Sequence, residues 1–416
     1  MVTREVNLSN RRIMITGLGA ITPLGLTVED YWEGLVNGRS GIGPITLFDT
    51  SSYPVKVAAE VKDFEPTDYM HIKRADRTGR CTQFAIAAAR MAVESARLDM
   101  SQENPERVGV EIASTGMVAL IADLGEILTK RGPMRTNPLL ISKIPPSMVP
   151  AQVGLEIGAK GPNSSLNSAC ASGSDALGTA LNHLRLGHAD VMIAGGAEAN
   201  ISPVAIALTG IVGALSRNPD PRTASRPFDR NRDGFVFGEG AGIMVLETYE
   251  HAQERGAPIL AELAGAGWSF DAYSETAPDA ETQVVAMRMA LQDAGISVEE
   301  VDYINAHGTS TKLNDAAETR ATKMVFGERA YKIPISSNKS MIGHLACAAG
   351  AVEAVAAVMT VKDGIIPPTI NYETPDPDCD LDYVPNKARY QRVNTCLSNS
   401  FGMGGQNCSL IIRRVS

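Results

Sequence analysis

The chain has 416 residues, of which 44% are hydrophobic and 20% are charged, so it can bury a substantial core in two or three domain-sized units. Its formal net charge of −9 argues against a general nucleic-acid-binding protein. The six cysteines show neither metal-ligand spacing nor the density of a disulfide scaffold, which favours reduced thiols in a cytoplasmic protein.

Two segments bear on membrane insertion, and both argue against it. Residues 1–12 are polar and lack the apolar stretch of a signal peptide. The longest apolar run, residues 203–215, is too short to cross a bilayer and contains Thr209, Gly210 and Gly213. We therefore expect a soluble, cytoplasmic protein with no membrane insertion.

Short apolar runs along the chain predict strands, and alanine-rich stretches between them predict helices. The predicted strands comprise residues 12–17, 108–114, 191–195, 242–247, 261–267, 303–306, 334–337, 395–398 and 409–413. The predicted helices include residues 81–95, 174–186, 282–294 and 346–362. Strands that alternate with helices predict an α/β fold, with helical layers around buried sheets.

The two halves of the chain resemble each other. Residues 170–173 (Cys-Ala-Ser-Gly) open a helix in the first half, and residues 347–350 (Cys-Ala-Ala-Gly) open an apolar helix in the second. Each half also ends with two closely spaced strands. We interpret this pattern as an internal duplication, in which residues 1–255 carry a candidate nucleophile and residues 256–416 carry two candidate histidines and a lysine.

Cys170 is the candidate nucleophile, because it lies where a polar turn runs into a helix of small residues. Unpaired backbone N–H groups and the positive end of the helix dipole favour the thiolate at such a position. The alternative is a buried cysteine that acts as a small hydrophobic residue. That alternative is favoured for the other five cysteines: Cys81, Cys347, Cys379, Cys396 and Cys408.

Two histidines and a lysine follow probable strands in the second half. His307 lies in an Asn-Ala-His-Gly-Thr segment, and Lys339 and His344 lie in a Lys-Ser-Met-Ile-Gly-His segment. Loops held by a sheet are where reactive groups gather, and the flanking glycines allow close approach. Either histidine alone could equally be a hydrogen-bonded structural residue. Their combination with Cys170 favours catalysis.

A glycine-rich segment around Phe401, residues 397–407, completes the set, because such a loop can place a backbone N–H against an oxyanion. In this order, the four segments resemble those of the β-ketoacyl-acyl carrier protein synthases, of the elongating Cys-His-His type (synthase II-like) in the thiolase superfamily. Residues 15–19, 226–229 and 233–240 match as well, and the resemblance extends from about residue 12 to 413. It implies a duplicated thiolase-like fold in five layers (α-β-α-β-α), with two mixed sheets and the active site between the halves.

The resemblance implies a decarboxylative Claisen condensation that uses no cofactor. The thiolate of Cys170 would attack an acyl thioester, and the backbone N–H groups of Cys170 and Phe401 would hold the oxyanion. A malonyl thioester would then lose carbon dioxide, with His307 and His344 stabilising the enolate as neutral N–H donors. Attack of the enolate carbon on the acyl group would release a 3-oxoacyl product and elongate a fatty acid.

Supporting roles also follow from the resemblance. Lys339 would lie near His307, held by Glu318, and would lower the electrostatic cost of the anion; the alternative is a buried Lys–Glu pair that only fixes the loop. Phe401 would also gate the two half-reactions, with core filler as the alternative. Four residues match a structural monovalent cation site of some relatives, or equally form a hydrogen-bond network: Asn305, Glu353, Ser398 and Asn399.

The expected partners are an acidic acyl carrier protein, acyl and malonyl thioesters, and a second copy of the chain. A cationic segment is the predicted docking patch for the carrier protein, with an ordinary solvated charge run as the alternative: Lys73, Arg74, Arg77 and Arg80. Relatives often carry an arginine near the site entrance, where this chain has Gly213. The homodimer would form through residues 163–168, the strand before Cys170.

Two positions of the expected acyl channel are smaller than in many relatives. Gly116 stands where an isoleucine is common, and Thr209 stands where some relatives have phenylalanine. These changes predict a pocket for longer or branched acyl chains. The alternative is that Met117 or another side chain refills the space.

Alternative functions differ from this interpretation in specific residues. A thiolase would place a second cysteine within residues 401–407, where none occurs, and an initiating synthase would pair one histidine with an asparagine. A non-catalytic subunit that sets chain length is disfavoured by the presence of Cys170. The ketosynthase of a type II polyketide system shares every catalytic motif, so that alternative stays open.

Overall fold

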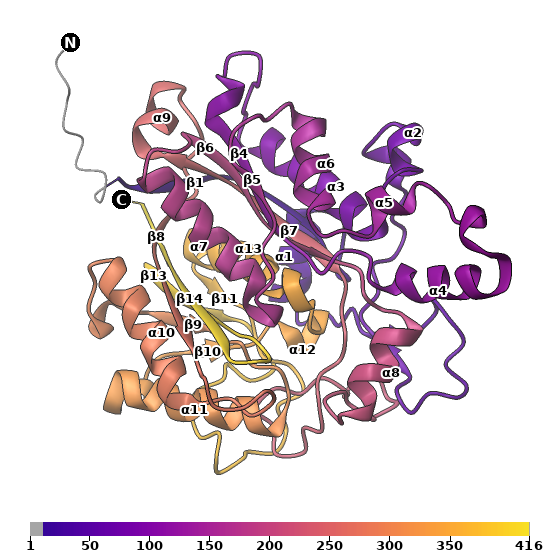
Figure 1. The fold of residues 1–416 in the computed structure, drawn as a ribbon. Helices are drawn as coiled ribbons and strands as arrows, with labels where there is room; N and C mark the ends of the chain where they lie inside the picture. Colours follow the sequence, from indigo (N-terminus) through magenta and orange to yellow (C-terminus); the bar gives the residue numbers. More distant parts are fainter. Residues whose placement is uncertain (1–10, 416) are drawn as a thin grey trace.

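A ten-stranded mixed sheet organises the chain in the computed structural model, which describes residues 11–415 (Figure 1). The strand order is β10-β9-β13-β14-β8-β1-β7-β6-β4-β5. The first half of the chain supplies β1 (Ile13–Ile21), β4 (Val108–Ala113), β5 (Asn163–Ser164), β6 (Val191–Glu198) and β7 (Gly240–Thr248). The second half supplies β8 (Ala261–Phe270), β9 (Tyr303–Asn305), β10 (Ile335–Ser336), β13 (Thr395–Phe401) and β14 (Gln406–Arg413).

The two halves of this sheet repeat one topology. In each half the third strand lies at the edge, followed by the second, fourth, fifth and first, and the fifth strand is antiparallel to both neighbours. The halves meet where β1 pairs with β8, through Met14 with Glu262 and Ile15 with Ala261. The two expected mixed sheets are therefore two halves of one hydrogen-bonded sheet. A shared strand order is what an internal duplication produces, while the boundary at residue 255 stays a prediction.

Helices form three layers around the two halves of the sheet (Figure 1). α3 and α6 cover the outer face of the first half, α7 and α13 pack against each other between the halves, and α10 covers the second half with α11 beside it. These helices are α3 (Arg80–Ser95), α6 (Met148–Ile157), α7 (Ser172–Arg185), α10 (Ala280–Asp293), α11 (Lys312–Phe326) and α13 (Ala349–Asp363). The order α-β-α-β-α confirms the predicted duplicated thiolase-like α/β fold.

The two central helices pack closely because their sequences are rich in small residues. A Cβ added at Gly173 would lie 2.6 Å from the main-chain nitrogen of Ala351, so this contact requires glycine. α13 is buried from Ala349 to Val361, and Glu353 is the one charged residue in that stretch. Because an isolated buried charge is costly, Glu353 needs a partner inside the protein.

The remaining elements are shorter or peripheral. They are α1 (Val28–Val36), α2 (Ile72–Ala75), α4 (Ala119–Arg131), α5 (Leu140–Lys143), α8 (Pro203–Ile211), α9 (Tyr249–Glu254), α12 (Lys339–Ile342), β2 (Gly43–Pro44), β3 (Val57–Ala58), β11 (Ile365–Ile366) and β12 (Arg389–Tyr390). The helices predicted at 174–186 and 346–362 are each preceded or opened by a 3-10 turn, η5 (Ala169–Ala171) and η8 (Ala346–Ala348). Among residues 11–415, no helix combines the length and apolar character needed to cross a membrane.

Candidate active site

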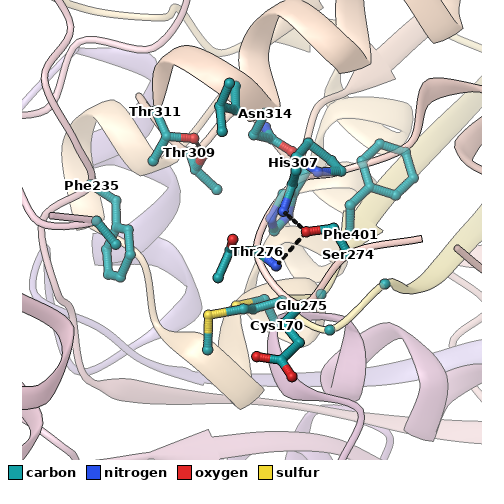
Figure 2. A pocket seen from close by; sticks show the side chains of 18 of the residues that line it. Cys170, Phe235, Ser274, Glu275, Thr276, His307, Thr309, Thr311, Asn314 and Phe401 are labelled. Atoms are coloured by element: carbon teal, nitrogen blue, oxygen red, sulfur yellow. Dashed lines mark hydrogen bonds between the residues drawn. The ribbon is translucent and has the colours of Figure 1, made fainter. Parts of the chain in front are cut away.

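A cavity of about 410 Å³ contains four of the predicted catalytic residues: Cys170, His307, His344 and Phe401. Cys170 comes from the turn η5, at the start of α7. His307 follows β9, His344 follows α12, and Phe401 ends β13. Figure 2 shows Cys170, His307 and Phe401 around this cavity. The fold therefore brings together motifs from both halves of the chain, as the sequence predicts.

Backbone strain and side-chain hydrogen bonds fix the turn that carries Cys170. Ala169, which precedes Cys170, has a φ of +51°, a conformation that costs a residue with a Cβ on the order of 1 kcal/mol. Ser172 Oγ accepts the N–H of Ser168 at 2.8 Å and donates to the carbonyl oxygen of Ala169 at 2.5 Å. Asp175 accepts the Ser168 hydroxyl at 2.9 Å. These contacts therefore hold the turn that places Cys170 at the cavity.

The electrostatics of Cys170 differ from the prediction. Its side chain is partly exposed, and burial is the largest effect on the thiol, raising its pKa above the ordinary value. The main-chain N–H of Met403 and the positive charge of Lys339 oppose that shift without reversing it. The direction of this shift is opposite to the one predicted from the helix terminus, and desolvation is its largest cause.

The two imidazoles lie edge to face, with ring centroids 5.4 Å apart. Burial, followed by the charge of Lys339, lowers the pKa of both His307 and His344 well below the ordinary value, so both rings are neutral. His344 Nδ1 accepts the N–H of Ala346 at 3.2 Å, which leaves the ring proton on Nε2. That Nε2 and His307 Nδ1 are buried and have no hydrogen-bond partner in the described chain. His344 therefore offers a free N–H donor.

Aromatic rings line both imidazoles. Phe401 lies with its ring centroid 5.9 Å from that of His307, and Phe235 lies 5.1 Å from His344. Both phenylalanines line the cavity. They keep water from the two histidines, which explains the strong effect of burial on the imidazole pKa values.

Lys339 has a different partner from the one expected. Its Nζ donates to a carboxylate oxygen of Glu353, and both side chains are 1% exposed. Glu318 instead accepts the N–H groups of His307 and Gly308, each at 2.8 Å, and so fixes the loop that carries His307. Burial raises the pKa of both carboxyl groups to about 7. The expected Lys339–Glu318 contact is wrong, and the charge of Glu353 in apolar α13 was the sequence signal for the true partner.

The four candidate cation ligands lie in a buried polar network. Asn305 Nδ2 donates to Ser398 Oγ at 3.1 Å, and Ser409 donates to Asn399 Oδ1 at 2.8 Å. Glu353 Oε2 has no hydrogen-bond donor within residues 11–415. An unpaired buried oxygen suits a hard cation, but most of the other groups satisfy one another. The monovalent cation stays a prediction.

The predicted docking patch is only partly available. Arg80 donates to both carboxylate oxygens of Glu239, at 2.7 and 2.9 Å. Arg74 pairs with Glu156 at 3.0 Å. Lys73 and Arg77 are exposed. The free charge of the patch is therefore that of Lys73 and Arg77, because carboxylates of the same chain neutralise the other two cations.

The predicted acyl-pocket residues lie outside the cavity that contains Cys170. Gly116 has a φ of +67°, and a Cβ there would come within 2.3 Å of the carbonyl oxygen of Ile144. Main chain thus occupies the space that an isoleucine would need. Met117 packs against Gly79, and Thr209 donates to the Ala205 carbonyl within α8 at 2.6 Å. The enlarged channel predicted at Gly116 is therefore not found, and main chain rather than the predicted side chain fills the space.

Two further walls of the cavity come from residues for which the sequence predicted no site role. Residues 271–278 form one wall, in which Ser274 Oγ accepts the N–H groups of Thr276 and Ala277 at 3.3 and 3.1 Å (Figure 2). Thr309 and Thr311 form another, with their hydroxyl oxygens 2.8 Å apart. The two threonines follow His307 closely in the sequence, and this proximity was the available signal for them.

Comparison with known proteins assigns the chain to a family. The model described as "Beta-ketoacyl synthase, N-terminal domain" matches residues 10–252, and that described as "Beta-ketoacyl synthase, C-terminal domain" matches residues 260–373. The chain belongs to the beta-ketoacyl synthase family. Its duplicated five-layered fold is the fold of the ketosynthase structures that it resembles.

Relatives in this family match the chain over nearly its full length. Proteins named "3-oxoacyl-[acyl-carrier-protein] synthase 2" from Synechocystis sp. and Coxiella burnetii are 47% and 46% identical, over 98% of this chain and 99% and 100% of their own. Among solved structures, "The ishigamide ketosynthase/chain length factor" superposes with a TM-score of 0.92 at 40% identity, covering 98% of this chain and 100% of its own. A type II PKS ketosynthase in complex with its acyl-carrier protein gives 0.89 at 38% identity, with the same coverage.

Proposed function

We propose that the protein is a 3-oxoacyl-[acyl-carrier-protein] synthase that elongates fatty acids. The observation that carries the proposal is one partly exposed cysteine and two neutral, buried imidazoles in a single cavity. Relatives with this name at 46–47% identity support the same reaction. Acyl and malonyl thioesters of a carrier protein are the substrates.

The first half-reaction transfers an acyl group to Cys170. The thiol loses its proton as sulfur attacks the thioester carbonyl, because burial keeps the free thiol protonated. Collapse of the tetrahedral intermediate breaks the original carbon–sulfur bond, and the departing thiolate takes up a proton. The backbone N–H groups of Cys170 and Phe401 are the proposed oxyanion donors.

The second half-reaction uses the histidines as electrostatic stabilisers. Loss of carbon dioxide from the malonyl thioester leaves an enolate, whose oxygen accepts N–H bonds from His344 and His307. The enolate carbon attacks the acyl carbonyl, and the bond to the sulfur of Cys170 breaks. The released thiolate of Cys170 then takes up a proton from solvent, which restores the free thiol. Burial, and after it the positive charge of Lys339, keeps both rings neutral, so each ring has one N–H to donate to the enolate oxygen.

A second candidate is the ketosynthase of a type II polyketide system. The solved ketosynthases with TM-scores of 0.92 and 0.89 favour it, since one is a ketosynthase/chain length factor and the other is a type II PKS ketosynthase. Both candidates share the condensation, and they differ in the acyl groups accepted. Repeated extension without reduction of the 3-oxo group would identify the polyketide activity.

Mass spectrometry of the acylated protein tests the proposal. The purified protein is incubated with a panel of saturated acyl carrier proteins and with a poly-3-oxoacyl carrier protein, then digested and mapped. We expect saturated acyl masses on the peptide that contains Cys170 and none on that of Cys347. Preferential loading of the poly-3-oxoacyl group would support the polyketide candidate, and absence of acylation at Cys170 would contradict both.

The carrier protein and a second copy of the chain are the proposed partners. Lys73 and Arg77 supply exposed positive charge for an acidic carrier protein. Edge strand β5 (Asn163–Ser164) is exposed at the end of the sheet order, where a second copy could extend the sheet. The double variant Lys73→Glu/Arg77→Glu should raise the KM for carrier-bound substrates, and sedimentation should give a dimer. An unchanged KM, or an active monomer, would count against the respective interaction.

A further inference from the structure

A second cavity adjoins the candidate active site. It encloses about 720 Å³ between α11 and residues 376–378. Four residues line both cavities: Ala277, Pro278, Lys312 and Leu313. The two cavities therefore adjoin at these four residues, and we name the second cavity the α11 groove.

Cationic side chains surround the α11 groove. Lys312, Arg320 and Lys323 lie on one face of α11, because residues separated by eight and eleven positions face the same side of a helix. Lys312 and Arg320 are about 12 Å apart along the helix axis at 1.5 Å per residue. Arg230 and Arg232 line the groove from another segment of the chain.

Two of these five cations are already neutralised. Arg232 pairs with Asp376 and lies 3.5 Å from Asp315, and Lys323 pairs with Asp380. Within residues 11–415, the side chains of Arg230, Lys312 and Arg320 make no ion pair, and of the carboxylates that line the groove only that of Asp378 is unpaired. In all, five cations face four carboxylates, those of Asp315, Asp376, Asp378 and Asp380, so the groove keeps a net positive charge.

Apolar side chains also line the groove. Pro278, Leu313 and Pro377 line it, and Leu313 is 62% exposed. A concave site with an apolar lining and a few free cations suits a ligand that combines a flat ring with phosphate groups. Arginine is well suited to both parts, because its planar guanidinium pairs with phosphate and stacks on rings.

We infer that the α11 groove binds the phosphorylated nucleotide end of a coenzyme A thioester, while the pantetheine arm extends through the shared wall toward Cys170. Coenzyme A has this form: a linear arm with sulfur at one end and a nucleotide with three phosphate groups at the other. The inference rests on the proposed function, since it concerns the thioesters that this site can hold. It adds coenzyme A thioesters to the carrier-bound thioesters that the active site is proposed to bind.

Calorimetric titration of the full-length protein at low ionic strength tests the inference. The ligands are coenzyme A, 3′-dephospho-coenzyme A and pantetheine, which share the arm and differ in phosphate. We expect coenzyme A to bind at least about tenfold more tightly than pantetheine, because charge-assisted contacts to phosphate contribute that much. The affinity for 3′-dephospho-coenzyme A should lie between those for coenzyme A and pantetheine.

The double variant Arg230→Ala/Arg320→Ala should remove most of the difference between coenzyme A and pantetheine. Lys332→Ala/Lys387→Ala is the matched control, because it removes the same charge from exposed residues outside both cavities, and it should bind coenzyme A like the wild type. Thermal unfolding checks that both double variants are folded.

Three results would overturn the inference. They are equal affinities of the wild type for coenzyme A and pantetheine, full retention of coenzyme A binding by Arg230→Ala/Arg320→Ala, and an equal loss in the control variant. If the groove variant binds coenzyme A normally but shows a higher KM for malonyl carrier protein, the groove serves the carrier protein instead. The titration needs no turnover, so it stays informative even if the condensation itself is not observed.

Discussion

The two halves of the molecule contain nearly the same 3-10 turn before a central helix, η5 before α7 and η8 before α13, but the surroundings of the two turns differ. We call each of these turns an elbow. Each has the sequence Ala-Cys-Ala, and the first alanine has a positive φ, +51° at Ala169 and +44° at Ala346. Yet Cys170 is partly exposed to a cavity, whereas Cys347 is 1% exposed. Cys347 Sγ lies 3.4 Å from Ser172 Oγ, and burial raises the pKa of the Cys347 thiol well above its ordinary value.

The comparison shows that the elbow alone does not make a nucleophile. The backbone geometry is shared, so the difference comes from what lies in front of the sulfur: a cavity with two imidazoles for Cys170, and packed protein for Cys347. The second half contributes differently. Glu353 in α13 occupies the position that Ala176 has in α7, counting from each elbow, and it holds Lys339 beside the histidines.

The largest expected effect comes from removing each sulfur in turn. Cys170→Ala should abolish acyl-enzyme formation and condensation but keep malonyl decarboxylation, because both histidines remain. Cys347→Ala should keep condensation and lose only a modest amount of stability, of the order of 1 kcal/mol for a small buried change. Condensation and decarboxylation assays on both variants measure this. Near wild-type condensation by Cys170→Ala would refute the assignment of the nucleophile.

Removing the charge of Glu353 should strongly destabilise the protein. Glu353→Gln leaves the buried ammonium of Lys339 unpaired, which typically costs about 3–5 kcal/mol. The free energy of unfolding, from denaturant titration, measures the loss. The double variant Lys339→Met/Glu353→Leu is the control, since it removes both charges and should regain most of the stability without regaining the decarboxylation rate. Equal stability of Glu353→Gln and the wild type would contradict a buried pair.

The pH dependence of decarboxylation should reflect the neutral imidazoles. Because the folded-state pKa values of His307 and His344 lie well below 6.5, both rings keep their N–H donors neutral as the pH falls through 6.5. From about pH 8 to 6, a range set around the ordinary histidine pKa, the imidazoles should therefore add no step to the decarboxylation rate of Cys170→Ala. Any step in this range should come from Glu318 or Glu353, whose pKa burial raises to about 7. A step with an apparent pKa near 6.5 that persists after Glu318→Gln and after Lys339→Met/Glu353→Leu would contradict this.

The same shifts predict a loss of stability in acid. Below pH 6.5 the unfolded chain binds protons at both histidines while the folded protein does not, so the free energy of unfolding falls as the pH decreases. The variant His307→Gln/His344→Gln should show a weaker pH dependence of Tm in that range. The difference from the wild type measures the contribution of the two histidines, apart from that of the carboxylates.

The smallest expected effect tests the strain shared by the elbows. Ala169→Gly and Ala346→Gly should each stabilise the protein by up to about 1 kcal/mol, because glycine adopts a positive φ without the steric cost of a Cβ. Tm measurements on both variants provide the check. A gain at one elbow and a loss at the other would show that the two strains differ despite similar angles.

The sequence predicted the parts of the site that depend on local motifs. Cys170, His307, His344 and Phe401 were recognised from the glycine and small residues around them, and the fold brings them together. The partner of Lys339 was mispredicted, because its contact with Glu353 joins two elements whose relative placement only packing determines. The space at Gly116 was misjudged for a similar reason, since a distant main-chain segment fills it.

The complete burial of α13 has a consequence for how the molecule can move. Its amide hydrogens from Ala349 to Val361 have no solvent-facing side from which local fraying could start. Their exchange with deuterium should therefore require opening of the whole core, with a free energy close to that of global unfolding. Glu353 lies on this helix and pairs with Lys339. The ion pair beside the two histidines should therefore break only when the whole protein unfolds.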